Sequence, residues 1–136
     1  MFPSPTEKNI KKISNDKIVK AYMKMRQMCG NMYRCSKISV YGTAYHTNQY
    51  ITLPGSTNSS MKFGKIVDLL CYKNNYAYFK YETLTSEYCV KSDLYFVKGQ
   101  QKYEIVPQHH LPCYRLGLHS RLKDLFIVTK LHHLRL

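Results

Sequence analysis

The stretch "FGKIVDLLCYKNNYAYFKYETL", residues 63–84, decides the expected fold, because it has the pattern of a β-hairpin. Two runs rich in aromatic and β-branched residues flank "KNN" at 73–75, which is typical of a tight turn. Alternate residues of a strand face opposite sides of the sheet. One face of the second run then carries Tyr76, Tyr78 and Lys80, and the other carries Ala77, Phe79 and Tyr81. In the first run the two sets are Phe63, Lys65, Val67, Leu69 and Gly64, Ile66, Asp68, Leu70.

Two interpretations of this hairpin remain open from the sequence. In the first, the face of Phe79 is core together with one set from the first run, and the other tyrosines are half-buried in cross-strand pairs. In the second, Tyr72, Tyr76 and Tyr78 form an exposed platform on which bases stack, while Lys73 and Lys80 contact phosphates. The same tyrosines are alternatively a cage for a methylated lysine, held by cation–π attraction.

A single amphipathic helix is predicted over residues 14–29, "SNDKIVKAYMKMRQMC". Apolar residues recur at helical spacing: Ile18, Tyr22, Met25 and Cys29. Ser14 or Asn15 is expected to cap it, and Gly30 to end it. The outward face is predicted to carry Lys17, Lys20, Lys24 and Arg26.

The rest of the chain predicts short strands separated by turns. Strands are expected at 33–41, 61–71, 76–84, 87–97 (with a break near 92–93), 103–106, 111–116 and 125–131, and a long loop at 43–60 that includes one short strand near Tyr50–Leu53. This pattern predicts a mainly β fold, a small barrel or sandwich of six to eight short antiparallel strands. We expect a mobile basic arm at 1–13, then one domain over 14–136 with a closed barrel at 33–131 and the helix packed across one of its openings.

Length and charge bound the class of protein. The chain has 136 residues, enough for one domain, and 44% of them are hydrophobic, which favours a globular fold. Its 21 Lys and Arg against 8 Asp and Glu give a net charge of +13. Such an excess concerns partners and solubility. Nucleic acid is its commonest reason, followed by an acidic protein or a membrane surface.

Targeting signals and cysteines favour an intracellular protein. The N-terminus "MFPSPTEKNIKK" lacks the apolar core of a secretory signal, and no apolar run approaches the length of a membrane span. The five cysteines, an odd number, are predicted to be reduced thiols: Cys29, Cys35, Cys71, Cys89 and Cys113.

No set of residues predicts a metal site or a catalytic centre. The spacing of His109, His110, Cys113 and His119 matches no familiar zinc motif, so we expect surface histidines beside a buried cysteine and no cofactor. Two candidate chemistries remain. One is a nucleophilic cysteine, Cys89 or Cys113, with His110 as its base, and the other is a metal-binding nuclease triad of Asp68, Glu82 and Asp93. Neither pattern has a second feature that supports it, so we predict that the protein is not an enzyme.

The order "YRCSKISVYGTAYHTNQY", "TNSSMKFGKIVDLL", "YAYFKY", "DLYFVK", "YEIVP" and "DLFIVTKLHHL" resembles a module near the C-termini of uncharacterised animal proteins derived from transposable elements. The matching positions are Asn58, Ser59, Phe63, Gly64, Ile66 and the run Ile127–Leu131. The resemblance covers about residues 33–136. It implies a small barrel similar to bromo-adjacent-homology (BAH-like) or Tudor-like modules of nuclear proteins that handle DNA or chromatin, with no catalytic residues.

The sequence therefore favours a non-enzymatic binding module for nucleic acid or chromatin, in the nucleus, with no membrane association. Its expected contacts are Lys17, Lys20, Lys24, Arg26, Tyr72, Lys73, Tyr76, Tyr78, Lys80, Arg115, Arg121, Lys123, Lys130 and Arg135, with the basic arm (Lys8, Lys11, Lys12) beside them. The alternative is a protein-interaction adaptor that docks a larger partner through the Met-rich helix or a strand edge.

Overall fold

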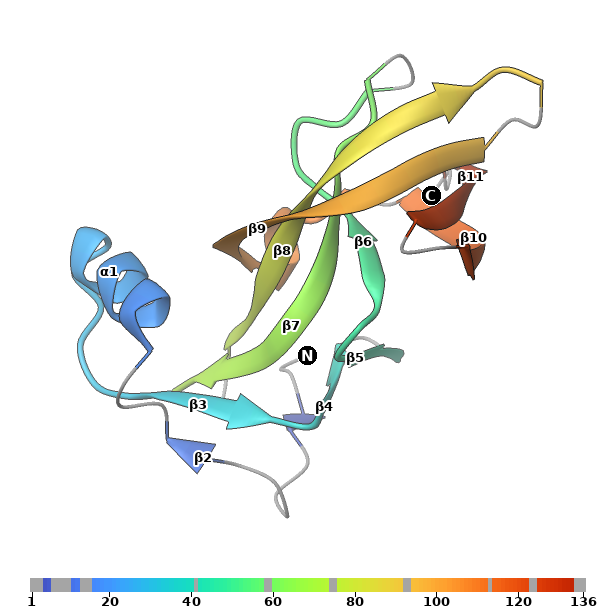
Figure 1. Ribbon diagram of the computed structural model, residues 1–136. Helices are drawn as coiled ribbons and strands as arrows, with labels where there is room; N and C mark the ends of the chain where they lie inside the picture. The colour runs from blue at the N-terminus through green and yellow to red at the C-terminus, as the bar shows by residue number, and fades with distance from the viewer. Residues whose placement is uncertain are drawn as a thin grey trace.

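The computed structural model describes residues 4–5, 11–12, 16–40, 42–57, 60–73, 76–91, 94–112, 114–122 and 125–133, with side chains described between 16 and 112. The prediction of a mainly β chain with one N-terminal helix is confirmed for these residues (Figure 1). The elements are β1 (Ser4–Pro5), β2 (Lys11–Lys12), α1 (Lys17–Met25), β3 (Met32–Cys35), β4 (Lys37–Val40), β5 (Thr43–His46), β6 (Tyr50–Thr52), β7 (Phe63–Tyr72), β8 (Tyr76–Cys89), β9 (Leu94–Pro107), a short 3₁₀ helix (Gln108–His110), β10 (Tyr114–Leu122) and β11 (Leu125–His133).

Several element boundaries differ from the predictions. The strand expected at 33–41 is divided at Ser36 into β3 and β4, which belong to different sheets. In the loop expected at 43–60, β6 is the predicted short strand, whereas β5 was not predicted. The separate strands expected after residue 76 are two long ones, because β8 and β9 pair from Tyr78↔Pro107 to Cys89↔Leu94. Within the predicted basic arm at 1–13, the structure describes only the residues of β1 and β2. β1 pairs with β4, and β2 pairs with β3.

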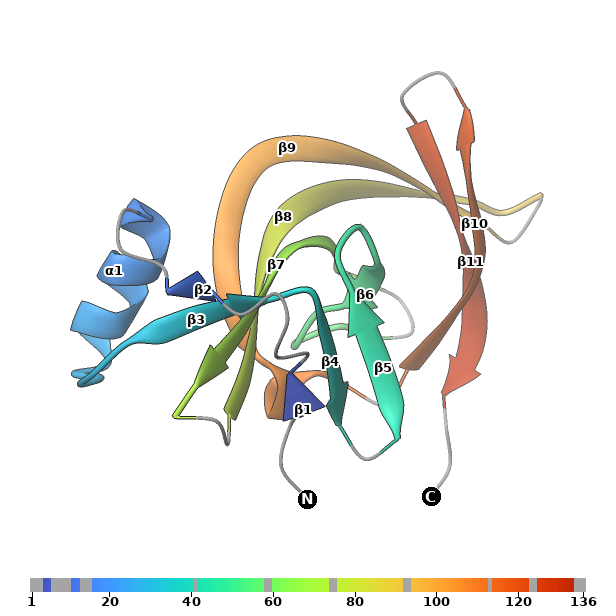
Figure 2. The ribbon, with the colours of Figure 1, turned by 90° about the horizontal axis from the view of Figure 1, so that it is seen from below.

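The described strands form two open sheets and do not close into the predicted barrel. The larger sheet has the order β10-β11-β9-β8-β7-β3-β2, with β6 also paired to β7, and the smaller sheet has the order β1-β4-β5. β3 and β6 share one edge of β7, since β3 pairs with its second half and β6 with its start. The β4–β5 hairpin separates β3 and β6 in the chain. The sheet of β7, β8 and β9 curves over β4, β5 and β6 (Figure 2).

The main hydrophobic core lies inside this curve. Phe79 of β8 and Ile38 of β4 are 0% exposed and belong to one cluster. Its other members are Cys35, Val40, Ile51, Leu53, Ile66, Leu69, Cys71, Ala77, Tyr81 and Val106. The interpretation that placed Ala77, Phe79 and Tyr81 on the buried face of the hairpin is therefore confirmed. A second cluster joins β6 to the first residues of β7 and β9, and it consists of Tyr50, Met61, Phe63, Tyr95 and Val97.

A β-bulge in β7 changes which residues share a face. The ladder to β8 shifts register between Ile66 and Asp68, so strict alternation is interrupted at Val67. Ile66 and Leu69 consequently both enter the main core, although they are three residues apart. The prediction that Ile66, Asp68 and Leu70 share a face is therefore wrong. Asp68 forms ion pairs away from that core, and Leu70 packs in the cluster under α1.

Helix α1 is shorter than predicted and has a different cap. Asp16, and neither Ser14 nor Asn15, is the N-cap: its carboxylate accepts hydrogen bonds from the backbone N–H groups of Ile18 and Val19. The helix ends at Met25, not at Gly30, in a Schellman motif. Met28 N–H bonds the Met23 carbonyl and Gln27, at φ 52°, takes the left-handed position. Both methionines pack against a hydrophobic cluster, which fixes the early end of the helix.

The helix lies on the outer face of the sheet. The prediction that it packs across a barrel opening is therefore wrong. Val19 packs with Met32, Leu70 and Tyr72, and with the partly buried Tyr78 and Ile105. These strand residues alternate with Leu69, Cys71, Ala77, Phe79 and Val106, which face the main core. Figure 2 shows α1 outside the curve of β7–β9, and β4 to β6 inside it. The sheet is thus covered on both sides here.

Candidate nucleic-acid interface

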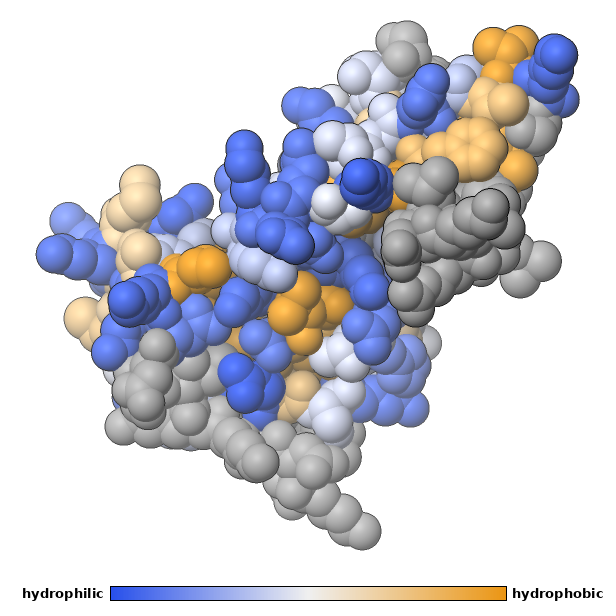
Figure 3. Space-filling model, viewed as in Figure 1, coloured by the Kyte–Doolittle hydropathy of each residue, from blue (hydrophilic) through white to orange (hydrophobic). Residues whose placement is uncertain are grey.

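Three lysines form a basic stripe on the exposed side of α1. Lys17, Lys20 and Lys24 are all exposed. At about 100° per residue their side chains fall within an arc of about 60°. Val19 and Tyr22, which are buried, point to the opposite side of the helix. Since each residue adds about 1.5 Å of rise, the stripe is about 10 Å long. Figure 3 shows hydrophilic groups over α1 and over the middle of β8 and β9.

The carboxylates of the described residues do not neutralise this stripe. Four of the five are engaged elsewhere in the chain: Asp16 with Lys80, Asp68 with Arg34, Glu82 with the Gln101 N–H and Glu104 with the Tyr81 hydroxyl. Among the side chains described between 16 and 112, no carboxylate forms an ion pair with a lysine of the stripe. The positive charge of α1 therefore faces solvent.

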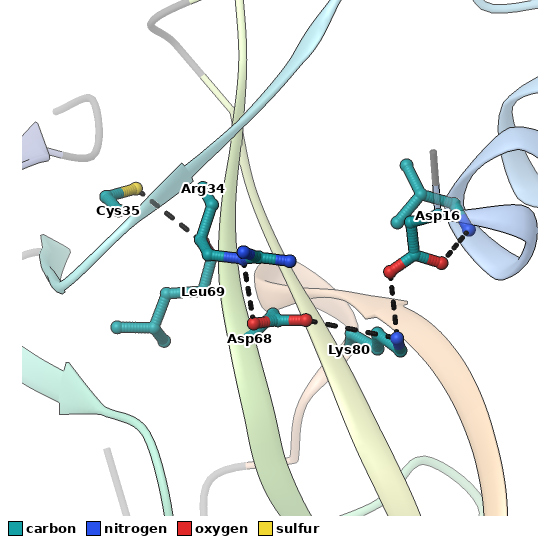
Figure 4. Close-up of polar contacts among 7 residues, drawn as sticks. Asp16, Arg34, Cys35, Asp68, Leu69 and Lys80 are labelled. Carbon is teal, nitrogen blue, oxygen red and sulfur yellow. Dashed lines mark hydrogen bonds and ion pairs between the residues drawn. The ribbon is translucent and has the colours of Figure 1, made fainter. Parts of the chain in front are cut away.

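Lys80, a predicted phosphate contact, belongs instead to an internal ion-pair network (Figure 4). Its Nζ lies 2.8 Å from Asp16 Oδ2 and 3.9 Å from Asp68 Oδ2. Arg34 Nε of β3 lies 3.0 Å from Asp68 Oδ1. The side chains of Lys80 and Asp16 are only 15% and 11% exposed, so this charge is used within the fold. Burial raises the pKa of Asp16, but the Lys80 hydrogen bond and the cap hydrogen bonds outweigh it and lower that pKa below its usual value.

The three tyrosines expected to form a platform have different surroundings. Tyr72 is buried and its hydroxyl donates a hydrogen bond to the Cys29 carbonyl. Tyr78 is half-buried and meets Tyr22 of α1 edge-on at 5.8 Å between ring centroids. Burial raises the pKa of both Tyr22 and Tyr78. Tyr76 alone of the three is exposed, at 51%. The prediction that all three tyrosines form an exposed platform is therefore wrong, because Tyr72 and Tyr78 pack under α1.

Two predicted cations lie beside this tyrosine cluster. The guanidinium carbon of Arg26 is 4.0 Å from the centroid of Tyr22, in cation–π geometry. Lys73 Nζ is 5.2 Å from the centroid of Tyr72, in the turn after β7. Both residues are exposed. They extend the positive charge of α1 toward the β7–β8 turn.

The predicted phosphate contacts of the C-terminal cluster cannot be assigned to this surface, because the structure does not describe their side chains. The backbones of β10 and β11 carry Arg115, Arg121 and Lys130, whose side chains are not described, and Lys123 and Arg135 lie outside the described residues. Sequence reasoning did not select five further exposed lysines: Lys37, Lys62, Lys91, Lys98 and Lys102. It also missed Asp16 as the partner of Lys80, for which no local signal exists.

The candidate metal and catalytic residues remain separate where they are described. His109 and His110 are exposed neighbours on the 3₁₀ helix, and the side chains of Cys113 and His119 are not described. Within the described side chains, no group of three or more His, Cys, Asp or Glu is placed to hold a metal. Asp68 pairs with Arg34 and Lys80, whereas Glu82 accepts a hydrogen bond from the backbone N–H of Gln101; Asp93 is outside the described residues.

A shallow, open hollow lies at the C-terminal end of β8, far from α1 in Figure 1. It is lined by Glu87, Tyr88, Cys89, Val90, Lys91 and Phe96. Glu87 and Cys89 are its candidate reactive groups, and within the described part of the chain no histidine lines it. The hollow therefore offers contact area without a paired acid, base and nucleophile.

Comparisons with known proteins leave the resemblance to BAH-like and Tudor-like modules a prediction. Of its positions, Phe63, Gly64 and Ile66 lie on β7 and Ile127–Leu131 lies on β11, whereas 58–59 fall outside the described residues. No helix in the described part of the chain is long and apolar enough to cross a membrane. No family model, curated protein or solved structure matches this chain.

Proposed function

We propose that this protein is a non-enzymatic binding module for nucleic acid that holds phosphates along α1. The observation that carries the proposal is the stripe of Lys17, Lys20 and Lys24, exposed and without a carboxylate partner among the described side chains. A solvated helix face normally alternates the signs of its charges, since i,i+4 pairs of opposite charge stabilise it. Here the face has only positive groups, and Lys17 stands at the helix end where a cation is disfavoured.

The spacing of the stripe suits a polyanion. One strand of duplex DNA carries a phosphate every 3.4 Å of helix axis or so, and about 10 Å of α1 therefore spans roughly three phosphates. Contacts of this type supply affinity and position without selecting a base sequence. A nuclear, chromatin-associated role belongs to the same proposal, supported by the net charge of +13 and the resemblance of residues 33–136.

The test is binding of labelled oligonucleotides, followed by fluorescence anisotropy at about 50 and 200 mM salt. Each phosphate contact contributes about 0.7–0.9 to the slope of log affinity against log salt. Replacing Lys17, Lys20 and Lys24 together by Gln is expected to reduce that slope by about 2–3. Absence of binding at low salt, or a flat salt response, would remove the proposal.

A matched variant controls for net charge. Lys62, Lys91 and Lys98 are exposed lysines outside α1, and replacing all three by Gln removes the same charge. We expect this variant to bind nearly as the parent does. An equal loss in both triple variants would show that the overall charge, and not α1, holds the ligand.

An adaptor role is the second candidate, because Met25 is 80% exposed at the end of α1. Lys24 and Arg26 flank it, so an acidic peptide with an apolar residue is the complementary partner. Size-exclusion chromatography with light scattering of the protein alone separates this idea from self-association. A Met25→Gln variant that lost affinity for a protein partner, while keeping its affinity for oligonucleotides, would favour it.

A further inference from the structure

Tyr76 is the most exposed aromatic side chain of the described residues. It is the first residue of β8 and stands opposite Tyr72, the last residue of β7. This backbone pair closes the hairpin, and Lys73 follows Tyr72 in the turn. An exposed tyrosine therefore stands beside an exposed cation.

Contacts of α1 and of the residues that flank it with β7 and β8 place Tyr76 on the side of the sheet toward the C-terminal end of α1. Three contacts establish the alignment. Asp16, at the start of the helix, bonds Lys80. Tyr22, in its middle, meets Tyr78. Cys29, after its end, accepts from Tyr72, the cross-strand partner of Tyr76. The basic stripe from Lys17 to Lys24 thus points toward the end of the hairpin that carries Tyr76.

The residues next to Tyr76 on the same face of the sheet are packed against one another. Tyr78, on the same face of β8, meets Tyr72 at 6.4 Å and an interplanar angle of 82°, and Tyr22 from the other side. Arg26 covers the Tyr22 ring. Because these neighbours hold the strand, a ligand that stacks on Tyr76 orders little besides itself. Within the described side chains, no carboxylate pairs with Lys73 or Arg26 to repel a phosphate.

We propose that Tyr76 stacks on an unpaired base while the lysines of α1 and Lys73 hold the adjoining phosphates, which makes the ligand a single-stranded nucleic acid. This inference rests on the proposed function and specifies its ligand. In a duplex the faces of the bases are covered by their neighbours, so that an aromatic ring on the protein surface finds no partner. In a single strand every base offers a face, and stacking tolerates any sequence.

The absence of tryptophan from the sequence allows a direct test. Tyr76→Trp introduces a unique fluorophore at the proposed stacking position. Tyr88→Trp is its control, since Tyr88 is 44% exposed near the far end of β8. Both variants are titrated with a thymidine oligonucleotide of about 12 nucleotides and with a duplex of the same length. We expect the single strand to quench the indole of the Tyr76→Trp variant and to leave that of the control unchanged, and the duplex to quench neither.

Affinity measurements on variants without tryptophan, compared with the parent chain, complete the test. Tyr76→Ala is expected to weaken binding of the single strand by roughly 5- to 100-fold, and Tyr76→Phe to retain it. Circular dichroism confirms that each variant is folded. Oligonucleotide binding that leaves the Tyr76→Trp fluorescence unquenched, equal quenching by duplex, or equal quenching of the Tyr88→Trp control would overturn the stacking inference and leave the phosphate contacts standing. Absence of any binding at low salt would overturn both proposals.

Discussion

The Nζ atom of Lys80 lies 2.8 Å from Oδ2 of Asp16, joining the middle of β8 to the first turn of α1. The same ammonium group is 3.9 Å from Asp68, which Arg34 of β3 also contacts. One lysine thus connects the helix that carries the basic stripe to the sheet beneath it. The orientation of the stripe depends on this connection and on the packing to either side of it.

Replacing Lys80 by Ala is expected to lower the free energy of unfolding by about 3 kcal/mol, because two largely buried carboxylates lose a partner. Arg34 remains beside Asp68, which keeps the effect from being larger. Urea denaturation measures the change. Lys98→Ala is the control: Lys98 is exposed, and its loss is expected to change stability by less than about 0.5 kcal/mol. Similar values for both variants would contradict the importance of the network.

The ion pair also predicts how stability depends on pH. The pKa of Asp16 is lowered in the folded protein from a usual value of 3.8. The unfolded chain therefore takes up its proton first as pH falls, so the contribution of Asp16 is complete above the unfolded value and is lost below about pH 4. Asp16→Asn keeps a good helix cap and removes this titration. Urea unfolding between pH 5 and 3 should show a shallower decline in the variant, and parallel curves would contradict the prediction.

Gly64 of β7 lies against the ring of Tyr81, so that a methyl group there has no space. A Cβ atom on Gly64 would come within 2.6 Å of Tyr81 Cδ2 and 3.3 Å of Leu53. Tyr81 is buried and its hydroxyl bonds Glu104, which limits its movement. Gly64→Ala is therefore expected to destabilise by about 1–3 kcal/mol, measured by thermal or urea denaturation.

Gly99 provides the comparison for Gly64. The nearest atoms to a Cβ atom on Gly99 would be those of the Glu82 carboxylate, all within 3.0 Å; this is the end of a flexible side chain that can move aside at the loss of its hydrogen bond from Gln101. Gly99→Ala should consequently cost less than Gly64→Ala. The reverse order would show that Tyr81 is free to move.

The two faces of β8 are expected to respond differently to truncation. Phe79 is completely buried in the main core, and Phe79→Ala should lower the free energy of unfolding by about 3–5 kcal/mol. Tyr76→Ala removes a half-exposed ring on the opposite face, for which we expect a loss of about 1 kcal/mol or less. Denaturation midpoints distinguish the two. Equal losses would contradict the assignment of faces.

The cysteines should differ in reactivity toward alkylating agents. Cys29 is exposed, whereas Cys35 and Cys71 are buried in the main core. A hydrogen bond between the thiols of Cys35 and Cys71, together with burial, raises the pKa of Cys35 and removes its thiolate at neutral pH. Iodoacetamide labelling with peptide mass spectrometry should modify Cys29 in the native protein and the buried pair only after unfolding. Rapid native labelling of Cys71 would contradict the placement of β7.

Local sequence patterns determined the secondary structure class and the orientation of the second hairpin strand. Alternation in "YAYFKY" placed Ala77, Phe79 and Tyr81 in the core, because a strand has only two faces and its apolar residues gather on one. The periodicity around Ile18 and Tyr22 likewise identified the single helix and the outward direction of its lysines. These features depend on neighbours within a few residues, so the sequence alone contains them.

Only the tertiary structure decided which charges and rings are available to a partner. The bulge at Val67 turned Asp68 away from the core, and α1 then covered Tyr72 and Tyr78 while Asp16 took Lys80 as its partner across 64 residues of chain. Periodicity places a side chain on a face but does not tell what packs against that face. Burial and ion pairing between distant segments are therefore decided only when the sheet curves and the helix lies upon it.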